Sequence, residues 1–205
     1  MKRLHRDDLY GWSQFNEERD LDFHSVLWVR PEGNVAIDPL PLSAHDRAHL
    51  QQLGGVEWIV CTNSDHVRAA GALAQEAGAR IAGPRAEAET FPLPCQRWLG
   101  DGEELVPGLL VLELHGSKTP GELALWIAPD TLVTGDLVRC HRAGWLCLLP
   151  DTKLRDPHQA RQSVARLLQL PRVDAVLVGD GWPVFRDGRA RLEELWNSLQ
   201  SQQTA

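Results

Sequence analysis

Short apolar runs and helix-forming segments alternate along the chain. The apolar runs have the length of strands, are rich in Val, Ile, Leu and Trp, and are bounded by turn-forming residues. They lie at residues 25–29, 34–37, 56–60, 80–82, 109–114, 123–127, 132–133 and 173–178. The helix-forming segments lie at residues 43–53, 66–77, 157–170 and 189–200, the first capped by Ser43 and the second closed by Gly78. This alternation, in two similar halves, predicts an α/β fold.

The segment from 83 to 107 is the least regular part of the chain. It contains four prolines and the sequence Gly100-Asp-Gly102, which favour turns, one short helix and an edge strand. No low-complexity segment, short repeat or linker interrupts the chain. We therefore expect a single domain over residues 1–205. A domain of this length buries about 70% of the surface of its unfolded chain.

The acidic composition narrows the classes of partner. The chain has 21 basic and 28 acidic side chains and a formal net charge of -7, which repels phosphate backbones and argues against nucleic acid. The charged first residues lack the apolar core of a signal peptide, and no apolar run is long enough to cross a bilayer. The four cysteines form no CxxC pair. We therefore expect a cytoplasmic protein with reduced thiols, a small-molecule ligand and no membrane partner.

Four short segments at predicted strand ends carry the candidate chemistry. They are Val60-Cys-Thr-Asn-Ser-Asp-His66, Gly116-Ser-Lys-Thr-Pro-Gly121, Val133-Thr-Gly-Asp136 and Val178-Gly-Asp-Gly181. Each is common by chance, but in this order and at these separations they resemble the signature loops of the metallo-β-lactamase superfamily. Ile37-Asp-Pro39 and Gly100-Asp-Gly-Glu103 are also similar to family features. The resemblance covers nearly the whole chain and implies a four-layer αβ/βα sandwich.

The resemblance implies that the first of the family's two metal sites is lost. In the family this metal is held by three histidines and a bridging aspartate. At the positions that resemble the histidines, this chain has Cys61, Asn63 and Lys118. A protonated lysine has no lone pair, so we expect the Lys118 ammonium to replace the metal. Cys61 is expected to be a small buried residue, and Asn63 is expected to brace its loop.

One metal-binding set survives in the pattern that the resemblance implies. The matching residues for the second metal are Asp65, His66, Asp136 and Asp180, the last in place of a histidine. A carboxylate is a competent ligand, so we expect at most one divalent ion, which could be zinc, manganese or iron. Lys118 offsets one of the three carboxylate charges, and a divalent cation would balance the other two.

The loops beyond the third and fourth segments supply the candidate ligand-binding residues. Arg139 and His141 follow the third segment, and loops after strand ends carry most binding groups. Trp182 directly follows the fourth segment and is expected to form a wall of the pocket. His115 lies outside the ligand positions of the pattern, and we expect a structural role for it. The substrate and the oligomeric state are left open by the sequence.

Two hypotheses for function follow. In the first, the protein is a hydrolase of a small ester or amide, in which one metal activates water, Lys118 stabilises the oxyanion, and Asp180 or Asp65 serves as base. In the second, it is a catalytically inactive, metal-free pseudoenzyme that acts as a binding or interaction module. In that case Lys118 is expected to form a buried ion pair with Asp136 and Asp180. A nuclease function conflicts with the acidic charge.

Overall fold

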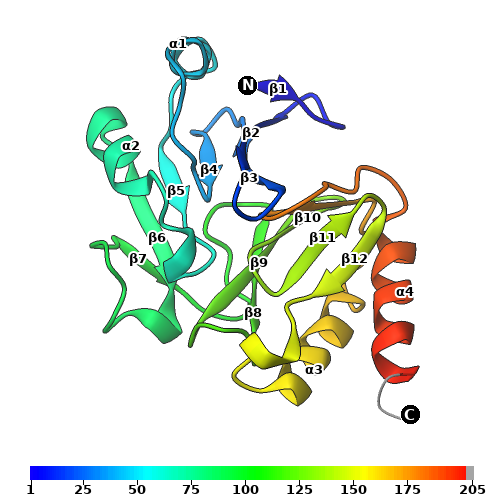
Figure 1. Ribbon diagram of the computed structural model, residues 1–205. Helices are drawn as coiled ribbons and strands as arrows, with labels where there is room; N and C mark the ends of the chain where they lie inside the picture. Colours follow the sequence, from blue (N-terminus) through cyan, green and yellow to red (C-terminus); the bar gives the residue numbers. More distant parts are fainter. Residues whose placement is uncertain (202–205) are drawn as a thin grey trace. The chain divides into compact units, whose positions relative to one another are not determined.

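A computed structural model describes residues 1–201, which divide into two compact units (Figure 1). Unit 1 comprises Met1–Leu99, and unit 2 begins at Gly100. Each unit has a main sheet that mixes parallel and antiparallel strands, together with two α-helices. The predicted α/β class is confirmed, whereas the single domain over residues 1–205 stays a prediction.

Unit 1 is built on a seven-stranded sheet whose strands follow chain order. The strands are β1 (Lys2–Arg3), β2 (Leu9–Asn16), β3 (Leu21–Trp28), β4 (Val35–Ile37), β5 (Trp58–Val60), β6 (Arg80–Pro84) and β7 (Arg97–Leu99). Pairing is antiparallel from β1 to β4 and parallel from β4 to β7. Because Ile37 pairs with Val60, the segments that carry Asp38 and His66 leave the sheet at the same edge.

Two α-helices, α1 (Ala44–Gln52) and α2 (Ala70–Ala77), pack on one face of this sheet. Ser43 caps α1 as predicted, because its hydroxyl accepts a hydrogen bond from a backbone N–H of the first turn. Gly78 ends α2 in the left-handed conformation, with φ 65°. The helices and strands share one apolar cluster, which includes Leu50, Leu73, Ile59 and Ile81.

The helix predicted over residues 66–77 begins later than expected. Residues Ser64–His66 form a 3-10 turn, η1, in which the Asn63 side chain accepts hydrogen bonds from the N–H groups of Asp65 and His66. The brace predicted for Asn63 is thereby confirmed. The short helix and edge strand expected between 83 and 107 are η2 (Arg85–Glu87) and β7. Strand β2 was not among the predicted strands, because Gly11 and Ser13 interrupt its apolar alternation.

Unit 2 contains a four-stranded sheet with the order β13-β10-β9-β8 and a separate hairpin. The sheet strands are β8 (Leu109–Leu114), β9 (Glu122–Ile127), β10 (Thr131–Thr134) and β13 (Ala175–Val178), and the hairpin is β11 (Val138–Arg142) with β12 (Trp145–Leu148). Strands β10 and β13 are parallel, and Thr134 pairs with Val178. The loops that carry Asp136 and Asp180 therefore start side by side, although the two residues are 44 positions apart in the sequence.

The helices α3 (Pro157–Leu167) and α4 (Gly188–Ser201) pack with the strands to form the apolar core of unit 2. A short 3-10 turn, η3 (Asp151–Lys153), precedes them. Val164 of α3 and Leu192 of α4 are fully buried in one cluster with Leu132 of the sheet. The hairpin β11–β12 was not predicted, because polar residues such as Arg139 and His141 break its apolar pattern. It contributes Val138, Cys140 and Leu146 to the same cluster.

The described helices carry no membrane-spanning candidate. None of those within residues 1–201 combines the length and the apolar character that crossing a bilayer requires. The cytoplasmic location expected from the sequence stays a prediction.

Gly181 offers a test of how tightly the fourth motif segment is held. Its φ is +95°, and a Cβ there would lie 2.2 Å from the carbonyl oxygen of Cys140. Gly144, at φ +80°, has nothing within 4 Å of such a Cβ. We predict that Gly144→Ala lowers the free energy of unfolding by about 1–2 kcal/mol, the usual cost of the left-handed conformation. Gly181→Ala should cost at least about 1 kcal/mol more, because the backbone of β11 must move.

Urea unfolding followed by circular dichroism measures both values. Equal losses for the two variants would contradict the close approach of Gly181 to β11.

Candidate functional site

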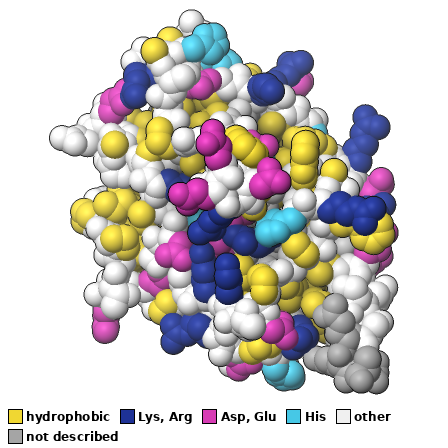
Figure 2. All heavy atoms as spheres, viewed as in Figure 1, with side chains coloured by type: hydrophobic (Ala, Val, Ile, Leu, Met, Phe, Trp, Pro, Cys, Tyr) yellow, Lys and Arg dark blue, Asp and Glu magenta, His cyan; other side chains and the backbone are white. Residues whose placement is uncertain are grey.

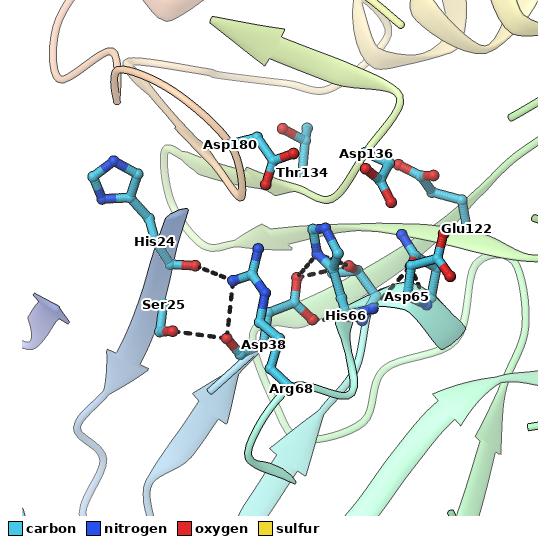
Figure 3. Close-up of polar contacts among 12 residues, drawn as sticks. His24, Ser25, Asp38, Asp65, His66, Arg68, Glu122, Thr134, Asp136 and Asp180 are labelled. Carbon is cyan, nitrogen blue, oxygen red and sulfur yellow. Dashed lines mark hydrogen bonds and ion pairs between the residues drawn. The ribbon is translucent and has the colours of Figure 1, made fainter. Parts of the chain in front are cut away.

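Asp38 organises the motif loop of unit 1 (Figure 3). It follows β4 with φ 47°, a conformation that few non-glycine residues adopt, and its side chain is buried. One carboxylate oxygen accepts a hydrogen bond from the Thr62 N–H at 2.7 Å, and the other accepts one from the Thr62 hydroxyl at 2.7 Å. The second oxygen also lies 2.7 Å from Nδ1 of His66. Asp38 therefore joins the end of β4 to the loop after β5.

The contact with Asp38 fixes the orientation of the His66 ring. His66 is buried, and its Nδ1 also lies 3.2 Å from the Thr62 hydroxyl. A carboxylate only accepts hydrogen bonds, so Nδ1 is the donor and carries the proton. In the neutral ring, Nε2 then bears the lone pair, which is the form that can accept a proton or bind a metal.

The backbone around Asp38 is held from two further directions. The Asp38 carbonyl accepts hydrogen bonds from the hydroxyl of Ser25 at 2.7 Å and from Nη1 of Arg68 at 3.2 Å. Arg68 also donates to the carbonyl of His24 at 2.6 Å. These contacts, drawn as dashed lines in Figure 3, keep Asp38 in its left-handed conformation.

A second buried acid, Glu87 of η2, braces the same loop through the N–H of Ser64 at 2.9 Å. Asp65, which the family pattern makes a metal ligand, has an exposed side chain. Cys61 is fully buried, and burial followed by the charge of Asp38 raises the pKa of its thiol well above the ordinary value. Cys61 is therefore a neutral apolar residue at neutral pH.

Unit 2 brings four of the predicted site residues together. Asp136 and Asp180 are both buried, and Nη2 of Arg139 makes an ion pair with each of them, at 3.1 Å from Oδ1 of Asp136. The ammonium of Lys118 lies 2.9 Å from Oδ2 of Asp136. Arg139 is 5% exposed and Lys118 is 26% exposed. The guanidinium is thus buried with both acids, while the ammonium reaches Asp136 from a more open position.

These two cations change the charge balance at the site. From the sequence, only Lys118 was expected to neutralise a carboxylate charge, and Arg139 was expected to bind the ligand. With both cations bound, the charges of Asp136 and Asp180 are compensated within unit 2. Acidic and basic side chains also lie interspersed on the face shown in Figure 2. Within unit 2, therefore, charge balance alone does not require a divalent ion.

Glu122 fixes the two loops that bear Lys118 and Asp136. This buried glutamate begins β9, and its oxygens accept hydrogen bonds at 2.6 Å from the hydroxyl of Ser117 and from the N–H of Leu137. Ser117 directly precedes Lys118, and Leu137 directly follows Asp136. Glu122 therefore sets the distance between the ammonium and the carboxylate.

Three further residues that the sequence singled out are exposed: His141 and Trp182 lie on or beside β11, and His115 follows β8. His141 is exposed, and its pKa is lowered by partial burial and then by the charge of Arg139. Trp182 is 56% exposed, and its N–H donates to the carbonyl of Cys140 at 2.7 Å. His115 is exposed, and both its N–H and its carbonyl bond the hydroxyl of Ser163 on α3. Its backbone is therefore anchored while its ring is exposed.

Sequence reasoning missed the three buried acids that brace the motif loops. Asp38 was noted only as part of a family-like segment, and Glu87 and Glu122 were not singled out. A signal was present for Asp38, because an acid directly after a buried strand leaves the sheet at the edge where sites form. Glu87 and Glu122 had no signal, since a lone glutamate in a sequence resembles any surface residue.

The donor chemistry of these residues does not fit the family's two-metal centre. Lys118 is a cation, and the side-chain oxygen of Asn63 already accepts two backbone hydrogen bonds. The protonated thiol of Cys61 is a poor ligand. Asp136 and Asp180 are occupied by a guanidinium that a metal ion would have to displace.

Comparison with known proteins assigns the family. The sequence profile of the metallo-β-lactamase superfamily matches residues 1–199. The chain therefore belongs to this superfamily, and its α/β fold with two mixed sheets and helices is the one expected from the motif segments. No curated protein matches the chain.

Solved structures of the superfamily are similar over nearly the whole chain. DIM-1 metallo-β-lactamase has a TM-score of 0.75 at 16% identity, covering 96% of this chain and 95% of that one. FIM-1 from Pseudomonas aeruginosa, in a mono-zinc form, has a TM-score of 0.71 at 12% identity, with 96% and 92% covered. TTHA1623, in a di-iron-bound form, has a TM-score of 0.67 at 24% identity, with 90% and 98% covered. At these identities the likeness shows the fold alone.

The brace formed by Glu122 can be tested by its removal. We predict that Glu122→Ala lowers the free energy of unfolding by about 2–4 kcal/mol, because two donors lose their buried acceptor. The control is Glu193→Ala on the exposed face of α4, which should stay within about 0.5 kcal/mol of the parent. Urea unfolding in the presence of EDTA measures both. Similar stabilities for the two variants would contradict the brace.

Proposed function

We propose that this protein is a catalytically inactive, metal-independent member of the superfamily that acts as a small-molecule binding module. The observation that supports this most strongly is the pairing of Arg139 with both Asp136 and Asp180. A buried guanidinium bound to two carboxylates supplies the positive charge that a metal would otherwise supply.

The energetics of displacement support the same proposal. If a metal ion took the place of the guanidinium on Asp136 and Asp180, the buried Arg139 would be left without its two counter-charges. Breaking a buried ion pair by removing one partner costs about 3–5 kcal/mol, because the other charge stays buried and unpaired. A metal would have to recover that cost, and the three positions of the first site do not supply a ligand set for a second ion.

Two of the side chains that the hydrolase hypothesis uses for catalysis are engaged in ion pairs. Asp180, a base in the hydrolase hypothesis, is held in an ion pair with Arg139. Lys118, which stabilises the oxyanion in the same hypothesis, is held in an ion pair with Asp136. A binding role needs neither group to change its partner during a reaction.

Metal content is the first test. We predict that untagged protein contains zinc, manganese and iron at far less than one ion per chain, and that calorimetric titration shows no tight binding of these ions. Elemental analysis of protein purified without a metal-affinity step measures the first quantity. One ion per chain that is lost in Asp180→Ala and retained in His115→Ala would overturn the proposal.

Removal of the guanidinium is the second test. In EDTA, Arg139→Gln should lower the free energy of unfolding by about 3–5 kcal/mol, because Asp136 and Asp180 then lack a buried counter-charge. Zinc or manganese should partly restore this variant but leave the parent unchanged, since the vacated carboxylates can bind a cation. The control is Arg142→Gln, an exposed residue of the same strand, with a loss within about 0.5 kcal/mol. A parent protein that zinc stabilises as much as the variant would contradict the role of Arg139.

A second candidate function, hydrolysis with one metal held by Asp65, His66, Asp136 and Asp180, is favoured by a different observation. The Asp38 carboxylate at Nδ1 of His66 is the arrangement that orients metal-binding imidazoles. The relatives FIM-1 and TTHA1623 were solved in mono-zinc and di-iron forms. The metal analysis above separates the two candidates.

A measurement of substrate turnover distinguishes the binding module from the hydrolase independently of the metal analysis. We predict no hydrolysis of nitrocefin or S-lactoylglutathione near about 10 per second, a median enzyme rate, with or without added zinc. Turnover at that rate, abolished by EDTA, would establish the hydrolase.

A further inference from the structure

The ion cluster of unit 2 has a donor that its two acids do not use. Both ion pairs of Arg139 are made by one nitrogen, Nη2. Its Nε is buried and has no hydrogen-bond partner among the described residues. A guanidinium offers five N–H donors, and buried donors in folded proteins are almost always satisfied by protein, water or a ligand. The unused Nε–H therefore indicates a missing acceptor.

The charges around this donor favour an acceptor that is negative. Lys118 brings a second positive charge to this cluster, because its ammonium contacts Asp136. The Lys118 side chain is 26% exposed, so an anion can approach it from solvent. Both cations offer only hydrogen-bond donors, which pair most strongly with a negatively charged acceptor.

An exposed aromatic residue is joined to the same strand through its backbone. Trp182 donates its backbone N–H to the carbonyl of Cys140, the residue between Arg139 and His141 on β11. Its indole is 56% exposed. An exposed indole on the segment that carries Asp180 favours a ligand that has a planar ring attached to its negative group.

From this juxtaposition we propose that unit 2 binds a small organic anion, a carboxylate or phosphate on an aromatic ring. Arg139 and Lys118 contact the anionic group, and Trp182 packs against the ring. The inference rests on the proposed function, because it needs Arg139 and Lys118 at the acids in place of a metal. It specifies the chemical class of the ligand, which the proposed function leaves open.

Calorimetric titration in EDTA tests the proposal with three probes: phenyl phosphate, benzoate and inorganic phosphate. The parent should bind one of the two aromatic anions, and whichever binds tighter identifies the anionic group. Lys118→Met should weaken that binding about tenfold, because a charge-assisted contact is lost. Trp182→Ala should weaken it about fivefold without changing the affinity for inorganic phosphate, since only the ring contact is removed.

Trp145→Ala is the matched control, because Trp145 is equally exposed on the neighbouring strand β12. It should leave every affinity unchanged. A nitrogen–proton spectrum adds a direct readout at Arg139: its Nε–H resonance, identified by its absence in Arg139→Gln, should shift when the aromatic anion binds. No binding of either aromatic anion at about 10 mM, well above ordinary ligand affinities, would overturn the proposal. Equal losses in Trp182→Ala and Trp145→Ala would do so too.

The metal content of the same sample separates this failure from that of the proposed function. Metal-free protein that binds no anion refutes the ligand class alone. Protein that holds one metal ion per chain and binds the probes only with the metal refutes both.

Discussion

The double ion pair of Arg139 is the interaction on which the chemistry of unit 2 depends. The two acids leave adjacent parallel strands, β10 and β13, at the same edge of the sheet, and neither is exposed to solvent. Two buried carboxylates so close together repel each other unless a cation or a proton lies between them. Arg139 supplies that cation from β11 and so holds the hairpin, the loop after β10 and the loop after β13 in one arrangement.

Buried carboxylates hold the motif loops in both units. Asp38 accepts the N–H of Thr62, Glu87 accepts the N–H of Ser64, and Glu122 accepts the N–H of Leu137. Charge-assisted hydrogen bonds of this kind satisfy loop donors that would otherwise be buried without a partner. The loops thus have supports made by side chains of the chain itself. This explains how the fold of the superfamily accommodates a changed set of residues at the metal positions.

Replacing metal ligands by cationic side chains reverses the preference of such a site. An imidazole offers a lone pair to a cation, whereas an ammonium or a guanidinium offers only donors. Lys118 stands where the family pattern has a histidine, and Arg139 adds a second donor-only cation beside the same acid. The fold fixes where these groups lie, and the groups themselves decide which chemistry is available.

The α/β class, most of the strands and helices, and the four motif segments could be predicted from the sequence, because they depend on local periodicity, capping and short patterns of residues. It also placed Lys118, Asp136 and Asp180 at candidate site positions. The partners of those residues became visible only in the folded chain. Arg139 meets both acids because β10 pairs in parallel with β13 and the unpredicted hairpin brings β11 beside them. Glu87 and Glu122 become braces because they are buried next to loop N–H groups. Pairings between residues far apart in the chain leave no local pattern, so the sequence shows which charges are present and the fold decides which of them meet.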